Sequence, residues 1–257
     1  MFRNSNKAML RKARKIAETL AGKYIKRGAL GVVFLGALAR GYFDKYADID
    51  VIIIKSKKSK IPSERKDYFN KEGFELDYCV VNYEDLLREK WSMEARWAYS
   101  QSIIYHDAKG VIKKLLKQKV PLKKSERKQL LIEGCAQSEW YVNELTKSWT
   151  LRGDTMSAHS MIHYGTEHFL NALFVLNGQL IPAGKWKFYC AQRLRWLPKN
   201  FAKKIKEVYK VETFSSAQLK KRRQAFMYLW NQLLPKVERE VGMKFSKALR
   251  DLFRECL

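Results

Sequence analysis

Two aspartates separated by a single residue, Asp48 and Asp50, are the side chains in this sequence that point most directly to chemistry. They lead into an apolar run, Val51 to Ile54, which is typical of a buried β-strand. Because side chains at i and i+2 of a strand point to the same face, the two carboxylates lie close together and repel each other. A cation between them removes that repulsion, and a set of oxygen ligands suits Mg²⁺. The pair therefore predicts a magnesium site.

A glycine turn precedes the aspartate pair in the sequence. The apolar run Val32 to Leu35 breaks at Gly36, and a short segment containing Arg40 and Gly41 follows. This pattern predicts a strand, a turn and the start of a helix. Backbone N–H groups at a helix start can hold phosphate oxygens, and glycine lets the backbone approach a ligand closely. Arg40 could add a charge-assisted contact to phosphate, and the alternative is a surface side chain.

A third carboxylate lies in a later apolar segment, Phe74 to Val81, which predicts another strand. Asp77 lies inside this strand, where a carboxylate without a partner costs free energy. That cost favours a functional role for Asp77. Glu75 shares its strand face, but a solvated strand residue is the simpler interpretation of that side chain.

Taken together, these three motifs (GALARG at 36–41, ADIDV at 47–51 and ELDYCVV at 75–81) resemble the polymerase β-like nucleotidyltransferase superfamily. The resemblance implies in-line transfer of a nucleotidyl group from an NTP such as ATP to a hydroxyl, with release of pyrophosphate. It implies two bound Mg²⁺ ions, which Mn²⁺ can replace. Ala37 stands where the family has a serine, so one hydroxyl contact to phosphate is missing. Ala47, before the aspartate pair, also departs from the family pattern.

The resemblance assigns roles to individual residues of this chain. The catalytic and metal-binding carboxylates are Asp48, Asp50 and Asp77, and Asp77 would also help to deprotonate the acceptor hydroxyl. The residues expected to bind the triphosphate are Gly36, Ala37, Arg40 and Lys185. Lys185 would reach the triphosphate from the second half of the chain, and its alternative interpretation is an ordinary surface lysine.

The best domain boundary is the segment PLKKS at 121–125, because the apolar spacing beyond it is helical almost throughout. We expect an α/β nucleotidyltransferase domain at 1–120, a small mixed sheet with helices, and an all-α helical bundle at 121–257. The second half resembles the C-terminal domain of small standalone nucleotidyltransferases, the group that includes antibiotic-modifying adenylyltransferases. That resemblance implies an acceptor-binding role.

Apolar periodicity and turn residues predict the elements that position these side chains. In the first half we expect strands near 30–35, 49–55, 74–81 and 102–105, and helices near 6–26, 62–71, 83–91 and 111–118. In the second half we expect helices near 126–151, 155–176, 185–194, 200–208, 216–234 and 236–256, with breaks at Pro182, Pro198 and Pro235.

Two polar groups in the second half have more than one interpretation. His159, His163 and Glu167 recur every four residues on one helix face. They could bind a metal or line a cleft, but a polar face with satisfied histidines is the simpler interpretation. The basic run Lys220 to Arg223 could contact RNA phosphates, and a solvated helix face is again simpler.

Composition limits the choice of partners. The formal net charge is +25, which favours a polyanion such as RNA, DNA or a nucleotide, unless it reflects a lysine-rich solvated surface. No apolar run is long enough for a membrane span, the N-terminus lacks a signal-peptide core, and the four cysteines are far apart. We therefore expect a cytoplasmic protein with reduced thiols.

The acceptor stays open at the level of sequence. An RNA end such as a tRNA 3′ terminus fits the charge, and a small molecule fits a helical second domain. Modification of a protein hydroxyl is a third option. A competing class is a catalytically inactive nucleotide- or RNA-binding module that retains the fold, and Ala37 is the feature in its favour.

Overall fold

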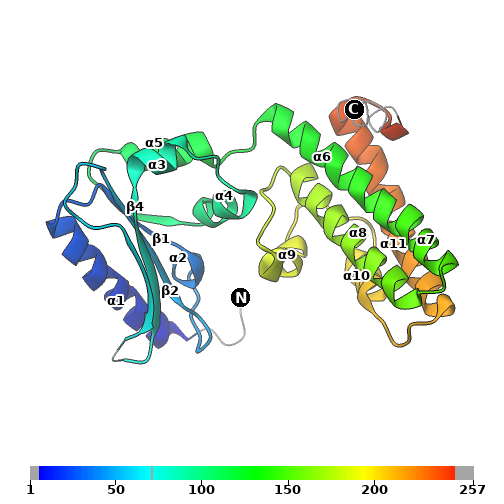
Figure 1. Ribbon diagram of the computed structural model, residues 1–257, viewed down its shortest axis with the longest axis horizontal. Helices are drawn as coiled ribbons and strands as arrows, with labels where there is room; N and C mark the ends of the chain where they lie inside the picture. The colour runs from blue at the N-terminus through cyan, green and yellow to red at the C-terminus, as the bar shows by residue number, and fades with distance from the viewer. Residues whose placement is uncertain (1–5, 71, 247–257) are drawn as a thin grey trace. The chain divides into compact units, whose positions relative to one another are not determined.

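The computed structural model describes residues 6–70 and 72–246, which fall into two compact units, Met1–Pro121 and Leu122–Leu257 (Figure 1). The first unit is α/β and the second is all-α, so the predicted fold class is confirmed. No helix among the described residues is long and apolar enough to cross a membrane. The catalytic and acceptor-binding roles that we assigned to the two domains remain predictions.

Unit 1 is built on a five-stranded mixed sheet with the strand order β3-β4-β2-β1-β5. Strands β2 and β4 are parallel, and the other neighbouring pairs are antiparallel. The strands are β1 (Gly31–Phe34), β2 (Ile49–Lys55), β3 (Glu64–Phe69), β4 (Glu75–Asn82) and β5 (Ile103–Asp107). The helices are α1 (Lys7–Lys26), α2 (Gly36–Arg40), α3 (Tyr83–Arg88), α4 (Met93–Ser100) and α5 (Val111–Lys119).

Helix α1 covers one face of this sheet (Figure 1). Its buried alanines let the helix lie close to Ile49, Val51 and Ile53, which alternate along β2 and form the larger core of the unit. The side chains between them point to the opposite face, where Ile52 packs with residues of α3, α4 and α5. Asp50 belongs to this second face, so the alternation places it away from α1.

The segment 62–71, for which we expected a helix, instead contains β3, an edge strand of the sheet. Asn70 forms the turn that follows it: its backbone N–H bonds to the Phe74 carbonyl at 2.8 Å, and its side chain accepts the Phe74 N–H at 2.9 Å. Backbone pairing with β4 therefore outweighs the local helix-start signal. The charged, exposed residues of β3 suit an edge strand, which must avoid pairing with other chains.

Unit 2 contains seven described helical segments. They are α6 (Lys124–Glu139), the π-helical segment η1 (Trp140–Leu145), α7 (Thr146–Leu151), α8 (Thr155–Leu176), α9 (Gly184–Ala191), α10 (Phe201–Tyr209) and α11 (Ser216–Val241). Helix α8 has the predicted bounds, and Asp154 caps it by accepting the Ser157 N–H at 2.9 Å.

The expected break at Pro235 is wrong, because this proline lies inside α11. An interior proline costs a helix roughly 3 kcal/mol. Leu233, Val237 and Val241 on either side are buried in the core of the unit, and their burial offsets that cost. The helix ends at Gly242, whose φ is +74°. The rest of the expected helix 236–256 lies partly outside the described residues.

Candidate active site

Asp50 and Asp77 are neighbours across two parallel strands. The β2–β4 register pairs Asp50 with Asp77, which places their Cα atoms side by side, roughly 4.8 Å apart, and directs both side chains to the sheet face opposite α1. Both residues are half-buried. The structure therefore brings together two of the three predicted carboxylates, which are separated in the sequence.

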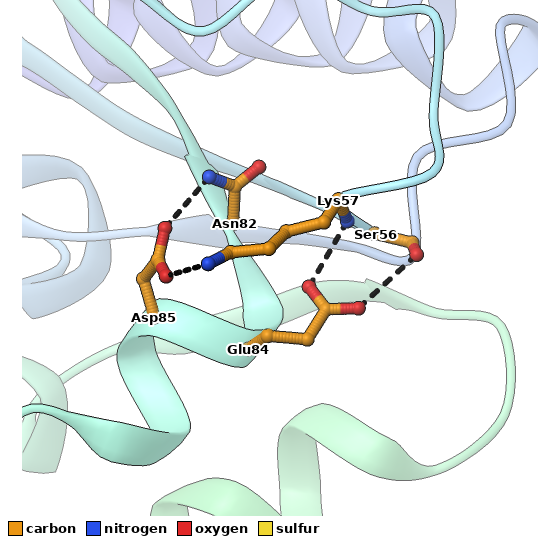
Figure 2. Close-up of polar contacts among 5 residues, drawn as sticks. All are labelled: Ser56, Lys57, Asn82, Glu84 and Asp85. Atoms are coloured by element: carbon orange, nitrogen blue, oxygen red, sulfur yellow. Dashed lines mark hydrogen bonds and ion pairs between the residues drawn. The ribbon is translucent and has the colours of Figure 1, made fainter.

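A polar network beyond the far ends of the same two strands supports this register (Figure 2). Glu84 accepts hydrogen bonds from the Ser56 hydroxyl at 3.1 Å and from the Lys57 backbone N–H at 3.0 Å. Asp85 accepts one from the Asn82 amide at 2.7 Å and pairs with the Lys57 ammonium at 2.6 Å. The network joins the end of β2 to the end of β4 and the start of α3. These carboxylates have a structural role.

The glycine turn lies against Asp50. Gly36 has a φ of +56°, and a β-carbon built on it would stand 1.7 Å from Oδ2 of Asp50. The Leu35 N–H also donates to the Asp50 carbonyl at 3.1 Å. The turn predicted to bind phosphate and the strand predicted to bind metal are thus in direct contact.

Asp48 lies immediately before β2 and is half-buried. Its charge acts on Tyr42: burial raises the pKa of the Tyr42 hydroxyl above its usual value, Arg40 opposes the shift, and Asp44 and Asp48 add to it. The guanidinium of Arg40 lies 5.2 Å from the ring centre of Trp97 and 6.0 Å from that of Tyr42. Arg40 is therefore held against aromatic rings and does not extend freely from the surface.

Ala37, which stands at the family's serine position, is 3% exposed and belongs to the same core as α1. Its methyl group packs inward. The backbone N–H groups of Gly36 and Ala37 belong to the first turn of α2, where helix geometry supplies no intrahelical acceptor. Any phosphate contact at these two residues must therefore come from the backbone.

The sequence reasoning missed Arg65, whose Nη2 forms an ion pair with Oδ2 of Asp77 at 3.0 Å. Asp67 lies on the same strand, directly opposite Asp77 in the β3–β4 register. Asp50, Asp77 and Asp67 thus form a row across three adjacent strands. Alternation could have placed Arg65 and Asp67 on one face, but only after 62–71 had been recognised as a strand.

The sheet face that carries the row of Asp50, Asp77 and Asp67 becomes apolar toward Cys79. Burial raises the pKa of the Cys79 thiol to about 11, and the nearby charge of Asp77 adds to the shift. The thiol is therefore protonated at neutral pH, which gives a weak nucleophile and a poor metal ligand. Of the side chains on this face, the carboxylates are the donors that suit a metal ion.

The donor types fit Mg²⁺, which prefers oxygen ligands. Asp50 and Asp77 form a pair across the two strands, and Asp48 precedes Asp50 by two residues, just before β2 begins. Within residues 6–70 and 72–246, no group of three or more His, Cys, Asp or Glu side chains is close enough together to hold a metal ion as it stands. A bound ion would therefore require small side-chain movements in this cluster.

The remaining predicted residues belong to unit 2. Lys185 is exposed near the start of α9. His159 is buried, with Nη1 of Arg222 at 2.8 Å from its Nδ1. Glu167 pairs with the Lys187 ammonium at 2.7 Å and accepts the Tyr209 hydroxyl at 2.8 Å. His159 and Glu167 therefore already have partners within the protein.

The basic run Lys220 to Arg223 is not a uniformly solvated helix face, as the simpler interpretation held. Arg222 is only 2% exposed, and Arg223 donates to the Asn143 side-chain carbonyl at 2.7 Å. Sequence spacing could not show this, because Arg222 lies among core positions of α11.

Comparison with known proteins gives one informative match. No protein-family model matches the sequence, and no curated protein does. Among solved structures, a nucleotidyltransferase-like protein from Exiguobacterium sibiricum aligns over 93% of this chain and 79% of its own, with a TM-score of 0.51 and 17% identity. An aminoglycoside 6-adenyltransferase from Bacillus subtilis aligns over 89% of this chain and 92% of its own, with a TM-score of 0.37 and 10% identity. The first match shows a shared fold.

Proposed function

We propose that this chain, which has the fold of a nucleotidyltransferase-like protein, is a Mg²⁺-dependent nucleotidyltransferase. It would transfer NMP from an NTP to a hydroxyl acceptor and release pyrophosphate. The observation that carries the proposal is the meeting of three elements at one place. Asp50 lies beside Asp77 in the strand register, and its carboxylate lies against Gly36 of the turn.

Asp48, Asp50 and Asp77 are the residues that would hold Mg²⁺. The metal supplies charge neutralisation on the phosphate oxygens when it is bound. The chain's own groups do the rest. Backbone N–H groups of Gly36 and Ala37, together with Arg40, would bind the triphosphate, and Lys185 would contribute if it reaches the nucleotide.

In the transfer step, the acceptor oxygen forms a bond to the α-phosphorus of the NTP while the bond from that phosphorus to the pyrophosphate oxygen breaks. Asp77 would accept the proton of the acceptor hydroxyl. Its carboxylate already faces the solvent-accessible side of the sheet, where Arg65 contacts it. Arg65 would have to move aside, or share the carboxylate, for this role.

Two acceptor classes fit this proposal. An RNA end such as a tRNA 3′ terminus is supported by the net charge of +25. A groove of about 620 Å³ between α1 and the β3–β4 hairpin, lined by Lys12, Lys15, Lys23 and Tyr68, lies on the sheet face opposite Asp50 and Asp77, so it would hold the body of such an RNA and not its reacting end. Lysines with an aromatic ring are suited to a single strand. A small-molecule acceptor is supported by the helical second unit.

The salt dependence of binding separates these acceptors. RNA affinity would fall steeply with salt, because each phosphate contact releases counterions. Replacing Lys12, Lys15 and Lys23 by glutamine should reduce that slope. An affinity that is independent of salt would favour the small-molecule acceptor.

Label transfer tests the reaction itself. The purified chain would be incubated with α-labelled NTPs and Mg²⁺ or Mn²⁺. Total RNA, a metabolite extract and cellular protein would be tested in turn as acceptors. We expect metal-dependent incorporation into one of these, and its loss in the Asp48→Ala plus Asp50→Ala variant. Activity that survives in this variant would show that the site is assigned wrongly.

A nucleotide- or RNA-binding module without turnover is the second candidate. Two observations favour it: Ala37 offers no hydroxyl, and Arg65 already contacts Asp77. Mg²⁺-dependent NTP binding without label transfer would support this candidate. A cytoplasmic location fits either function, because Cys79, Cys135 and Cys190 are free thiols.

A further inference from the structure

Arg222 is a buried cation in the core of unit 2. Its Nε donates to the Val208 carbonyl at 2.5 Å, and its Nη1 donates to the His159 carbonyl at 2.9 Å. The 2.8 Å contact between Nη1 and Nδ1 of His159 makes that ring nitrogen the acceptor, because a guanidinium has only donors. His159 is therefore neutral, with its proton on Nε2, which faces the Ser215 carbonyl at 3.3 Å.

The charge of Arg222 has no carboxylate partner among the described residues. Its three acceptors are neutral, and burial lowers the pKa of its guanidinium, opposed only by Tyr209. A buried charge compensated only by dipoles leaves a desolvation cost that a counter-charge would reduce. Helix α8 carries one acidic residue, Glu167, and it is already paired with Lys187.

A pocket of about 270 Å³ opens beside this guanidinium. Its lining includes Arg222, two histidines and three aromatic rings: His159, His163, Tyr164, Tyr209 and Phe214. These residues come from α8, the end of α10, the start of α11 and the segment before α11, and the three helices pack together in unit 2. The volume is just below the roughly 300–1,000 Å³ of pockets for drug-sized ligands, so it suits a molecule with a single ring.

The donors and walls of the pocket suit an anion attached to a ring. Among the described residues, Nη2 of Arg222 has no hydrogen-bond acceptor, so it can donate a charge-assisted hydrogen bond to an oxygen of a carboxylate or phosphate group. Tyr209 and Phe214 stand edge-on to His163 and His159, with ring centres 5.3 and 5.4 Å apart. These aromatic walls would stack on a planar ligand body.

We propose that this pocket, formed around Arg222, binds a small molecule that carries a carboxylate or phosphate group on a planar ring. The anionic group contacts Nη2 of Arg222, and the ring lies among Tyr164, Tyr209 and Phe214. Binding here requires nothing from the carboxylates of unit 1. It would persist even if the chain does not transfer nucleotides.

The four histidines of the chain give a site-specific test. The full-length protein would be titrated with benzoate, phenyl phosphate and, as a neutral analogue, benzamide, while the histidine ring protons are followed by NMR. We expect saturable shifts of the His159 and His163 signals with one or both anions. We expect no such shifts with benzamide, and none at His106, which lies on β5 of unit 1. Equal shifts with benzamide, or equal shifts at His106, would overturn the proposal.

Matched variants assign the anion contact. Arg222→Gln should weaken binding about tenfold or more, because it removes a charge-assisted contact. Lys221→Gln makes the same charge change at the exposed neighbouring position and should leave the affinity unchanged. Unchanged affinity in Arg222→Gln, or equal weakening in both variants, would refute the assignment.

Arg222 also donates hydrogen bonds to α10 and α8, so Arg222→Gln could fail to fold. A second variant covers that outcome. Tyr164→Ala then serves, because Tyr164 is 52% exposed and its truncation spares the core. We expect the anion affinity to fall severalfold while the unfolding midpoint stays close to that of the parent protein. An unchanged affinity in this variant contradicts the proposed position of the ring.

Discussion

The carboxylate of Asp50 lies directly against the α-carbon of Gly36, so that a β-carbon on this residue would stand 1.7 Å from Oδ2 and 2.8 Å from Cγ. The same glycine has a φ of +56°, a conformation that other residues adopt at a cost. Both the space and the backbone therefore require glycine here. The contact fixes the distance between the turn and the aspartate pair, which come from different elements.

Gly36→Ala should displace either the turn or the Asp50 side chain. We expect a loss of about 2–4 kcal/mol in the free energy of unfolding, from the left-handed backbone and the overpacking together. We also expect loss of Mg²⁺-dependent NTP binding. Urea unfolding and nucleotide titration measure the two effects.

Gly41→Ala is the matched control, because Gly41 ends the same short helix with a φ of +76° and has nothing within 4 Å of its would-be β-carbon. It should lose only the backbone contribution, about 1 kcal/mol, and keep nucleotide binding. If the two variants lose equal stability and function, the contact with Asp50 has no special role.

Asp50→Asn should abolish nucleotidyl transfer while leaving the fold intact. The control is Asp85→Asn, which removes a charge from the network at the other end of β2 and β4. Label transfer should persist in the control. Transfer that persists in Asp50→Asn would contradict the assigned role.

The local part of the site could be predicted from the sequence. Gly36, Asp48 and Asp50 belong to one continuous segment whose strand, turn and strand follow from apolar runs and a glycine. The position of Asp77 inside a strand followed from the apolar run around it. Its pairing with Asp50 is a matter of register between distant segments, which the pattern of one strand does not specify.

The missed features depend on contacts between distant segments. Arg65 reaches Asp77 only because β3 pairs with β4, and local signals at 62–71 favoured a helix. Arg222 is buried because α8 and α10 cover its side of α11, although its neighbours are mostly basic. Pro235 stays helical because residues around it are held in the core. In each case tertiary packing outweighs local preference.

Arg65 and a metal ion should compete for Asp77. We expect Arg65→Gln to lower the Mg²⁺ concentration that gives half-maximal activity, with little change in stability, because the Arg65 side chain is 75% exposed. The control is Lys66→Gln, the adjacent residue, which points to the other face and pairs with Glu64 at 3.0 Å. A metal requirement that shifts equally in both variants would indicate a general charge effect.

Glu167 should make the stability of unit 2 depend on acid pH. Burial raises the pKa of its carboxyl, but the hydrogen bonds and charge of Lys187 and the Tyr209 hydroxyl outweigh burial, and the net pKa lies below the usual 4.5. A carboxyl with a lowered folded-state pKa stabilises the fold above its unfolded-state pKa, and this contribution is lost as pH falls through the folded-state pKa. The parent protein should therefore lose stability as the pH falls below about 4.5.

Glu167→Gln should weaken that dependence, because the variant has no proton to bind at this position. At neutral pH it should be less stable by about 1–3 kcal/mol, since the Lys187 ammonium stays buried without its counter-charge. Urea unfolding from neutral pH into the acid range measures both effects. Glu207→Gln is the matched control, because Glu207 pairs with Lys204 at the same 2.7 Å but in a more exposed position. Glu207→Gln should lose stability with falling pH much as the parent protein does, and Glu167→Gln should lose less. If Glu167→Gln and the parent lose stability in parallel, Lys187 and Tyr209 do not stabilise the charged form of Glu167.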